Sequence, residues 1–112
     1  MDEGVDVGPL VNADTRGKVA AFVADAVAKG AKIECGGEAI DGKGYFYPPT
    51  VLSNVPENAD CVQDEIFGPV AAIQTFRDQD DVIKRANDTE YGLVAYVFSG
   101  DFKRALQVCE RL

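Results

Sequence analysis

The last third of the sequence alternates between strand-like and helix-like hydrophobic patterns, and this alternation restricts the fold more than any other feature. Residues 70–76 are expected to form a buried strand, and residues 93–99 a second one. Residues 78–87 and 101–112 have the spacing of amphipathic helices. A strand–helix–strand order with short links favours a parallel pair joined by a right-handed crossover. We therefore expect an α/β fold.

An amphipathic helix is predicted between residues 12 and 29. Its apolar residues recur at positions i, i+3, i+4, i+7 and i+8, which places them on one face. Asn12 or Asp14 could cap its start, since both side chains accept hydrogen bonds from first-turn N–H groups. Gly30 suits the left-handed residue that often follows a helix.

The middle of the chain predicts short strands separated by turns. Residues 32–35 are expected to be extended and to stop at the Gly-Gly pair 36–37. The aromatic residues at 45–47 favour a strand that continues to residue 52. However, the prolines at 48 and 49 cannot donate to a ladder, so an edge or irregular strand is expected rather than a central one.

The final helical pattern continues to the last residue of the sequence. After the expected cap Asp101, one apolar stripe is formed by Phe102, Ala105, Leu106, Cys109 and Leu112. A helix end usually offers a glycine or a polar cap, and none follows here. The chain therefore looks cut from a longer protein, with residues 1–112 forming a single fragment of one domain.

The charge balance argues against two classes of partner. Nineteen acidic and eleven basic residues give a formal net charge of −8, which repels nucleic acid backbones and anionic membrane surfaces. No apolar run approaches the roughly 20 residues that a membrane-spanning helix needs. We expect no nucleic acid partner, no membrane partner and a cytoplasmic location.

Cysteine and histidine usage limits the chemistry. Cys35, Cys61 and Cys109 are odd in number and widely spaced, so neither a disulfide framework nor a metal site is suggested. Reduced and mostly buried thiols are expected. Histidine is absent, which removes the commonest metal ligand and the usual general base of nucleophilic triads.

The segment from Gln63 to Val70 is the best candidate for a binding loop. Pro69 has a fixed φ and restricts the glycine before it, so Glu65 and Phe67 are held in a defined relation to the following strand. A carboxylate beside an aromatic face suits the recognition of a ribose with its attached ring. Two plainer interpretations stay open: Glu65 as part of a solvated acidic turn, and Phe67 as a plug in the core.

The sequence from Glu65 to Val70, EIFGPV, resembles the signature of the aldehyde dehydrogenase superfamily. Other segments occur in the same order and at similar spacing in that family: Gly8-Pro9-Leu10, Gly30-Ala31-Lys32, Gly36-Gly37, Gly44-Tyr45-Phe46, Pro49-Thr50-Val51, Ala86-Asn87 and Tyr91-Gly92-Leu93. The style of residues 44–52 is closest to succinate-semialdehyde dehydrogenases. The resemblance covers nearly the whole chain.

The resemblance implies a part of the catalytic domain, with a Rossmann-like parallel sheet flanked by helices. It implies oxidation of an aldehyde with NAD or NADP by a larger enzyme that is a homo-oligomer, in which a cysteine attacks the aldehyde and hydride passes to the nicotinamide. Glu65 resembles the residue that binds the nicotinamide ribose, and Phe67 the aromatic that packs against the nicotinamide. Lys18 falls near the margin of that site, although a solvated helix lysine is the plainer interpretation, and Asp64 replaces a more usual glutamate.

No catalytic residue is expected within this chain. None of its cysteines lies in the Gly-Gln-x-Cys context of the family nucleophile, and the family's general-base motif is also missing. The fragment should therefore be inactive without the rest of the parent enzyme, and its separation should expose apolar surface that favours self-association. The alternative is a stand-alone interaction or structural domain with the same fold and no redox chemistry.

Overall fold

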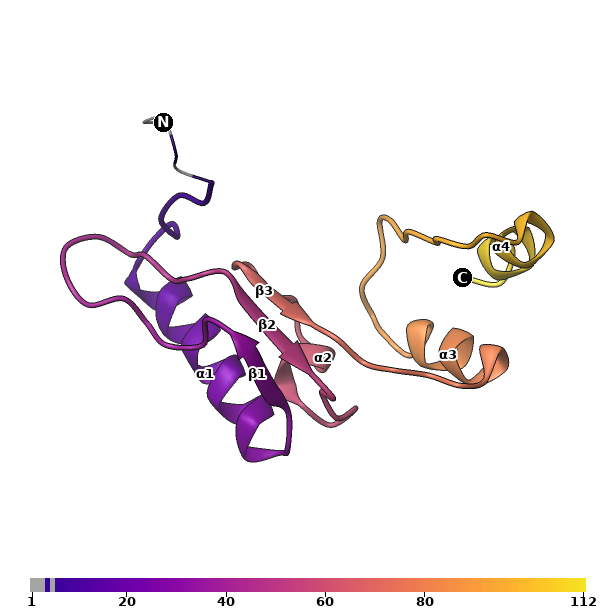
Figure 1. The fold of residues 1–112 in the computed structure, drawn as a ribbon, viewed down its shortest axis with the longest axis horizontal. Coiled ribbons are helices and arrows are strands. Elements are labelled where there is room, and N and C mark those ends of the chain that lie inside the picture. Colours follow the sequence, from indigo (N-terminus) through magenta and orange to yellow (C-terminus); the bar gives the residue numbers. More distant parts are fainter. Residues whose placement is uncertain (1–3, 5) are drawn as a thin grey trace. The chain divides into compact units, whose positions relative to one another are not determined.

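The computed structural model describes residue 4 and residues 6–112, which divide after Thr75 into two compact units (Figure 1). The first unit contains helix α1, strands β1 and β2, the short helix α2 and strand β3. The second unit contains helices α3 and α4. Each unit is described by itself.

Helix α1 spans Ala13–Ala28, within one residue of the predicted bounds at each end. Asn12 is the cap, because its side-chain oxygen accepts a hydrogen bond of 2.8 Å from the N–H of Thr15. Gly30 has a φ of +109°, as expected for the residue that turns the chain away from the helix. The predicted apolar face is confirmed by four buried residues, Val19, Phe22, Val23 and Ala26.

The first unit contains a three-stranded sheet in the order β1-β2-β3 (Figure 1). Strand β1, Lys32–Cys35, pairs antiparallel with β2, Thr50–Ser53, and β2 pairs parallel with β3, Val70–Ala72. The α/β class is confirmed, and the parallel part of the sheet is the β2–β3 pair. The expected edge position of the strand after the prolines was wrong, since β2 is central. Both prolines precede β2, and its first residue already donates from its N–H to the carbonyl of Pro69 at 2.8 Å.

The core of the first unit joins the inner face of α1 to the sheet and to α2, Asp60–Gln63. Thr50 is a buried polar residue in this core, and its hydroxyl is satisfied by two bonds. It accepts from the N–H of Gly37 and donates to the carbonyl of Pro48, each at 2.9 Å. Tyr47 is buried beside it, and its hydroxyl donates to the carbonyl of Gly37 at 3.1 Å.

Both predicted helices of the second unit are present. Helix α3 spans Gln79–Ala86 and helix α4 spans Phe102–Cys109, so α4 ends before the predicted residue 112. Asp78 caps α3 by accepting from the N–H of Asp81 at 2.8 Å, and Asp101 caps α4 in the same way.

The two strands predicted in the last third are shorter than expected or missing. Strand β3 covers Val70–Ala72 rather than residues 70–76, because β2 supplies partners for only those three residues, and β3 is half-buried rather than buried. Residues 93–99 form no strand. A strand requires a neighbour, and the described residues of the second unit include no other extended segment that pairs with it. The predicted strand–helix–strand crossover was therefore wrong for this chain.

The three cysteines are free, but the expectation that they are mostly buried was wrong for two of them. Cys61 is buried in the core, whereas Cys35 and Cys109 are exposed. Cys35 lies on β1, whose four residues are all exposed, and no residue of α4 is buried. Within the described part of the chain, no group of three or more possible ligands could hold a metal ion.

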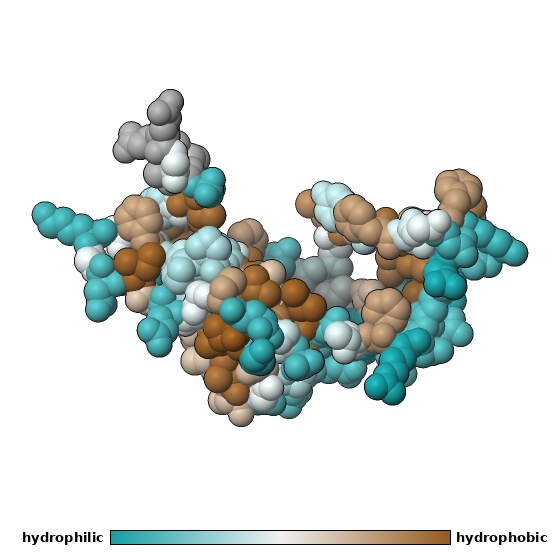
Figure 2. Space-filling view, viewed as in Figure 1, coloured by the Kyte–Doolittle hydropathy of each residue, from teal (hydrophilic) through white to brown (hydrophobic). Residues whose placement is uncertain are grey.

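Apolar side chains reach the surface of the second unit, where Figure 2 shows brown patches among teal residues. The most exposed large apolar residues there are Leu93, Tyr96, Phe98 and Phe102. None of the described helices is both long enough and apolar enough to span a bilayer.

Candidate functional site

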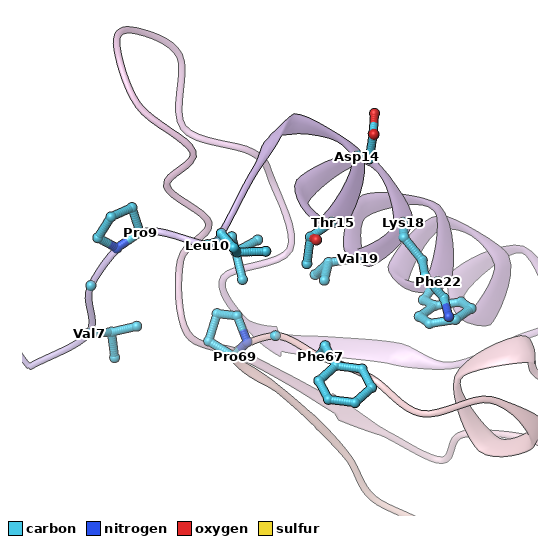
Figure 3. Close-up of a pocket in the computed structure, with 13 residues that line it drawn as sticks. Val7, Pro9, Leu10, Asp14, Thr15, Lys18, Val19, Phe22, Phe67 and Pro69 are labelled. Carbon is cyan, nitrogen blue, oxygen red and sulfur yellow. The ribbon is translucent and has the colours of Figure 1, made fainter.

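A cavity of about 870 Å³ lies in the first unit, beside the first half of α1 (Figure 3). Three segments form its walls: the chain before α1, one face of α1, and the loop that leads into β3. The residues that line it are Val7, Gly8, Pro9, Leu10, Val11, Asp14, Thr15, Lys18, Val19, Phe22, Phe67, Gly68 and Pro69. Most of these are apolar, which suits a ligand with a flat hydrophobic part.

The α1 wall is a consequence of helical spacing. Thr15, Lys18, Val19 and Phe22 are related by steps of three and four residues, so they lie on one face of the helix. Asp14, four residues before Lys18, lies at the edge of this face, and in Figure 3 its carboxylate points away from the other lining side chains. The wall therefore has an apolar base and one lysine.

The loop wall is held close to both the helix and the sheet. A Cβ atom added at Gly68 would lie 2.5 Å from Cγ2 of Val19, closer than real side-chain contacts allow. The next residue, Pro69, accepts a hydrogen bond from the first N–H of β2 at 2.8 Å. The position of Phe67 is therefore fixed by a glycine that lets the loop approach α1 and a proline that restricts its backbone.

Phe67 is 72% exposed and lines the cavity. The interpretation of this residue as a core plug is therefore wrong for the chain described here. A phenyl ring left in water at this position has an uncovered face available for stacking against a ligand ring.

Glu65 is exposed, and it is not among the residues that line the cavity. The structure thus places Phe67 on the wall, and Glu65 two residues before it in the same loop. Lys18, which sequence reasoning placed at the margin of the site, shares the cavity with Phe67. Its ammonium lies 5.0 Å from the ring centroid of Phe22 and 3.9 Å from the carboxylate of Asp64. Both partners of this ion pair are about half exposed, so the pair contributes little to stability.

Sequence reasoning missed the opposite wall, formed by Val7, Pro9 and Leu10. In the sequence, the Gly8-Pro9-Leu10 segment contributed only to the family resemblance. This wall is positioned by a contact with no local signal, because the N–H of Leu10 donates to the carbonyl of Tyr45, 35 residues later, at 2.9 Å.

The cavity, with its uncovered phenyl ring and apolar walls, suits a flat ring. Outside its lining, in the same loop, the exposed carboxylate of Glu65 is an acceptor for hydroxyl groups. Gly68 lets the loop lie close to α1, since a side chain there would clash with Val19 unless one of the two shifted.

The cysteines are poorly suited to be the nucleophile of this site. None of them is among the described residues that line the cavity. Cys61 is buried, and burial raises the pKa of its thiol above the usual value, which disfavours the reactive thiolate.

An apolar, aromatic-walled cavity beside the sheet of an α/β unit is the kind of place where a small molecule or cofactor binds. The family model described as "Aldehyde dehydrogenase family" matches residues 1–112. The chain therefore belongs to the aldehyde dehydrogenase family, as its EIFGPV segment suggests.

Relatives of known name cover the chain almost completely. It is 50% identical over 111 residues to a succinate-semialdehyde dehydrogenase of Paenarthrobacter nicotinovorans. The match covers 99% of this chain and 25% of the relative. It is 46% identical to the NADP(+) succinate-semialdehyde dehydrogenase of Escherichia coli strain K12. This match covers 100% of this chain and 23% of the relative. The chain thus spans about a quarter of the length of these relatives.

Solved structures agree with this assignment. A succinate-semialdehyde dehydrogenase from Burkholderia pseudomallei matches with a TM-score of 0.94 and 40% identity, over 99% of this chain and 23% of that one. An NADP-dependent enzyme of E. coli matches with a TM-score of 0.94 and 46% identity, over 100% of this chain and 23% of that one. The expected fold, a part of an aldehyde dehydrogenase with a sheet flanked by helices, is confirmed.

Proposed function

We propose that this chain is part of an enzyme that oxidises an aldehyde of the succinate semialdehyde type to a carboxylic acid, with NAD+ or NADP+ as the hydride acceptor. Family membership supports the reaction class. Two relatives named succinate-semialdehyde dehydrogenase, at 50% and 46% identity, support the substrate type, and the name of one of them includes NADP(+).

Within that enzyme, this chain contributes one side of the cofactor site rather than the nucleophile. Glu65 accepts hydrogen bonds from the hydroxyls of the nicotinamide ribose, and Phe67 offers its ring face to the nicotinamide. The observation that carries this proposal is the exposure of the Phe67 ring on the wall of an apolar cavity, at the end of a loop held by Gly68 and Pro69. A charged acceptor and a flat face together orient a ring for hydride transfer.

The remaining parts of the proposal concern the parent protein. Residues 1–112 act as a single fragment of its catalytic domain, and the fragment alone is inactive because it contains no cysteine in the Gly-Gln-x-Cys context. The parent enzyme is a cytoplasmic homo-oligomer. Support for the location is that several relatives are named cytosolic aldehyde dehydrogenases.

The role of Glu65 is tested by Glu65→Gln in the full-length parent enzyme. The amide keeps one acceptor but loses its charge-assisted hydrogen bonds, each worth roughly 1.5 to 3 kcal/mol. We expect single-turnover hydride transfer to slow by about tenfold or more, with an unchanged melting temperature. The control is Glu38→Gln, which changes an exposed glutamate outside the cavity lining and should leave both values at the parent level.

The two alternatives give different results in the same assays. If Glu65 lies in a solvated turn, its glutamine variant will have the kinetics of the parent enzyme, and the proposed role fails. If Glu65 stabilises the fold instead, the melting temperature will fall together with the rate.

A further inference from the structure

Three charged side chains join the last two turns of α1 to the short helix α2, directly before the loop that carries Glu65 and Phe67. They are Asp25 in the last turn of α1, Lys29 at the C-cap of α1, and Asp60 on α2. Their spacing gives no sequence signal, since Asp60 lies 35 residues after Asp25.

Helix α2 depends on this contact for its start. It has four residues, too few to be stable alone, and its N-cap residue Ala59 has no side-chain hydrogen bond to offer. The N–H of Asp60 donates instead to the carboxylate of Asp25 at 2.8 Å. Asp25 therefore satisfies the first free N–H of α2 from another helix, the service that an N-cap side chain gives to later N–H groups of the first turn.

Lys29 uses its ammonium group to close the cluster. Its Nζ atom lies 2.7 Å from the carbonyl oxygen of Asn58, 2.9 Å from Oδ1 of Asp60 and 2.8 Å from Oδ1 of Asp25. An ammonium has three donors, and three acceptors surround this one. The side chains of Lys29 and Asp25 are 29% and 24% exposed, so this pair is less solvated than the Lys18–Asp64 pair. The backbone bond from Asp60, followed by the bond from Lys29, lowers the pKa of Asp25 below its usual value, so its carboxylate stays ionised at neutral pH.

The cluster fixes one end of the site loop, residues 64–69, and the other end is fixed by the same helix. Asp64 follows α2 at once, and its N–H donates to the carbonyl of Asp60 at 2.9 Å. At the far end, Gly68 packs against Val19 of α1. Both ends of the site loop are thus attached to α1, with Glu65 and Phe67 between them.

We propose that Asp25, Lys29 and Asp60 form a positioning cluster for Glu65 and Phe67. The inference rests on the proposed function, because its consequence is the affinity for the nicotinamide half of the cofactor. Breaking the cluster releases α2 and lets the site loop sample other positions. The dinucleotide then loses contacts at its nicotinamide end, while the contacts of its adenine end are untouched.

The test compares Asp25→Ala with the parent in the full-length enzyme by calorimetric titration. Two probes are used: the preferred dinucleotide, NAD+ or NADP+, and ADP or its 2′-phosphate, which lack the nicotinamide ribose. We expect the dissociation constant of the dinucleotide to rise about fivefold or more. The dissociation constant of ADP or its 2′-phosphate should change by less than twofold. The matched control is Asp41→Ala, which removes an exposed aspartate from the loop before β2 and should change neither.

Conservative variants separate positioning from general destabilisation. Asp25→Asn keeps an acceptor for the N–H of Asp60 and should lose less dinucleotide affinity than Asp25→Ala. Lys29→Met should reproduce the loss, and Lys29→Arg, which keeps the cation, should restore most of the affinity. Equal weakening of both probes, or no rescue by arginine, would overturn the proposal.

Glu65→Gln in the same titration tells the two proposals apart. If this variant binds the dinucleotide like the parent, the proposed cofactor site itself is wrong. If it binds more weakly while Asp25→Ala does not, the cofactor site stands and the positioning cluster is wrong.

Discussion

Gly36 shows how the backbone around a single residue can decide its identity. Its φ is +69°, and a Cβ atom there would lie 2.4 Å from the carbonyl oxygen of Pro49. The conflicting atom belongs to the backbone just before the central strand, so it cannot move aside as a flexible side chain can. Glycine is required at this position both by the dihedral angle and by the space.

Gly36→Ala should lower the free energy of unfolding by roughly 2 to 4 kcal/mol, because strain and overpacking add. Gly42→Ala is the control: this glycine also has a positive φ, +125°, but nothing lies within 4 Å of the added methyl group. Its expected loss is about 1 kcal/mol, from strain alone. Urea denaturation followed by circular dichroism measures both. Equal losses would show that the close approach to Pro49 is relaxed at no cost.

At the same scale, the sequence indicates individual candidate residues more clearly than it indicates what surrounds them. Phe67 is located by the Gly68-Pro69 pair that follows it, which is a local and readable constraint. The exposure of its ring could not be predicted, since an aromatic residue before a Gly-Pro pair is equally compatible with a buried position in the core. The partners of Asp25 were equally hidden, because a carboxylate on a helix surface gives no sign of a backbone N–H that arrives 35 residues later.

Among the elements, α1 was predictable because three independent signals agree on it. Its apolar spacing, its Asn12 cap and the glycine at position 30 all give the same bounds. The segment 93–99 lacked such agreement, because a strand depends on pairing that hydrophobic composition does not encode. Strand β2 was misplaced for a related reason: prolines argue against a central strand only when they lie inside it.

The cap of α1 can be tested by Asn12→Ala in the parent enzyme. Loss of the bond to the N–H of Thr15 should cost about 1 kcal/mol. Hydrogen exchange in the first turn of α1 should then be roughly fivefold faster, since local opening becomes easier by that amount. Peptide-resolved mass spectrometry measures the rates. Asn58→Ala, on the loop before α2, is the control, and the same acceleration in that variant would show that the cap is not the cause.

At the scale of the whole chain, the second unit buries little. Within residues 76–112, all of which the structure describes, Ile83 is the one buried apolar residue, and Leu93, Phe98 and Phe102 are largely exposed. Apolar surface of this kind is usually covered in a larger protein. The α/β class could be predicted from this sequence. The packing of its last third could not, because the chain spans about a quarter of its relatives' length.

The purified 112-residue chain should give no aldehyde-dependent reduction of NAD+ or NADP+ above buffer, because no thiol lies in the described lining of its cavity. Absorbance of the reduced cofactor at saturating aldehyde measures this directly. The full-length parent enzyme under the same conditions is the positive control. Turnover that disappears when Cys35, Cys61 or Cys109 is replaced by serine would show that one of these thiols is a nucleophile after all.

Contacts at both ends of the site loop lead to α1, through α2 and Asp25 at one end and through Gly68 and Val19 at the other. A small displacement of α1 would therefore act on both ends of the loop, while the hydrogen bond from Thr50 to Pro69 holds the far end to β2. In the proposed cofactor site, such a displacement would move Glu65 and Phe67 relative to the nicotinamide end of the cofactor. A design that exchanges parts between relatives should therefore transfer α1, α2 and residues 64–69 together.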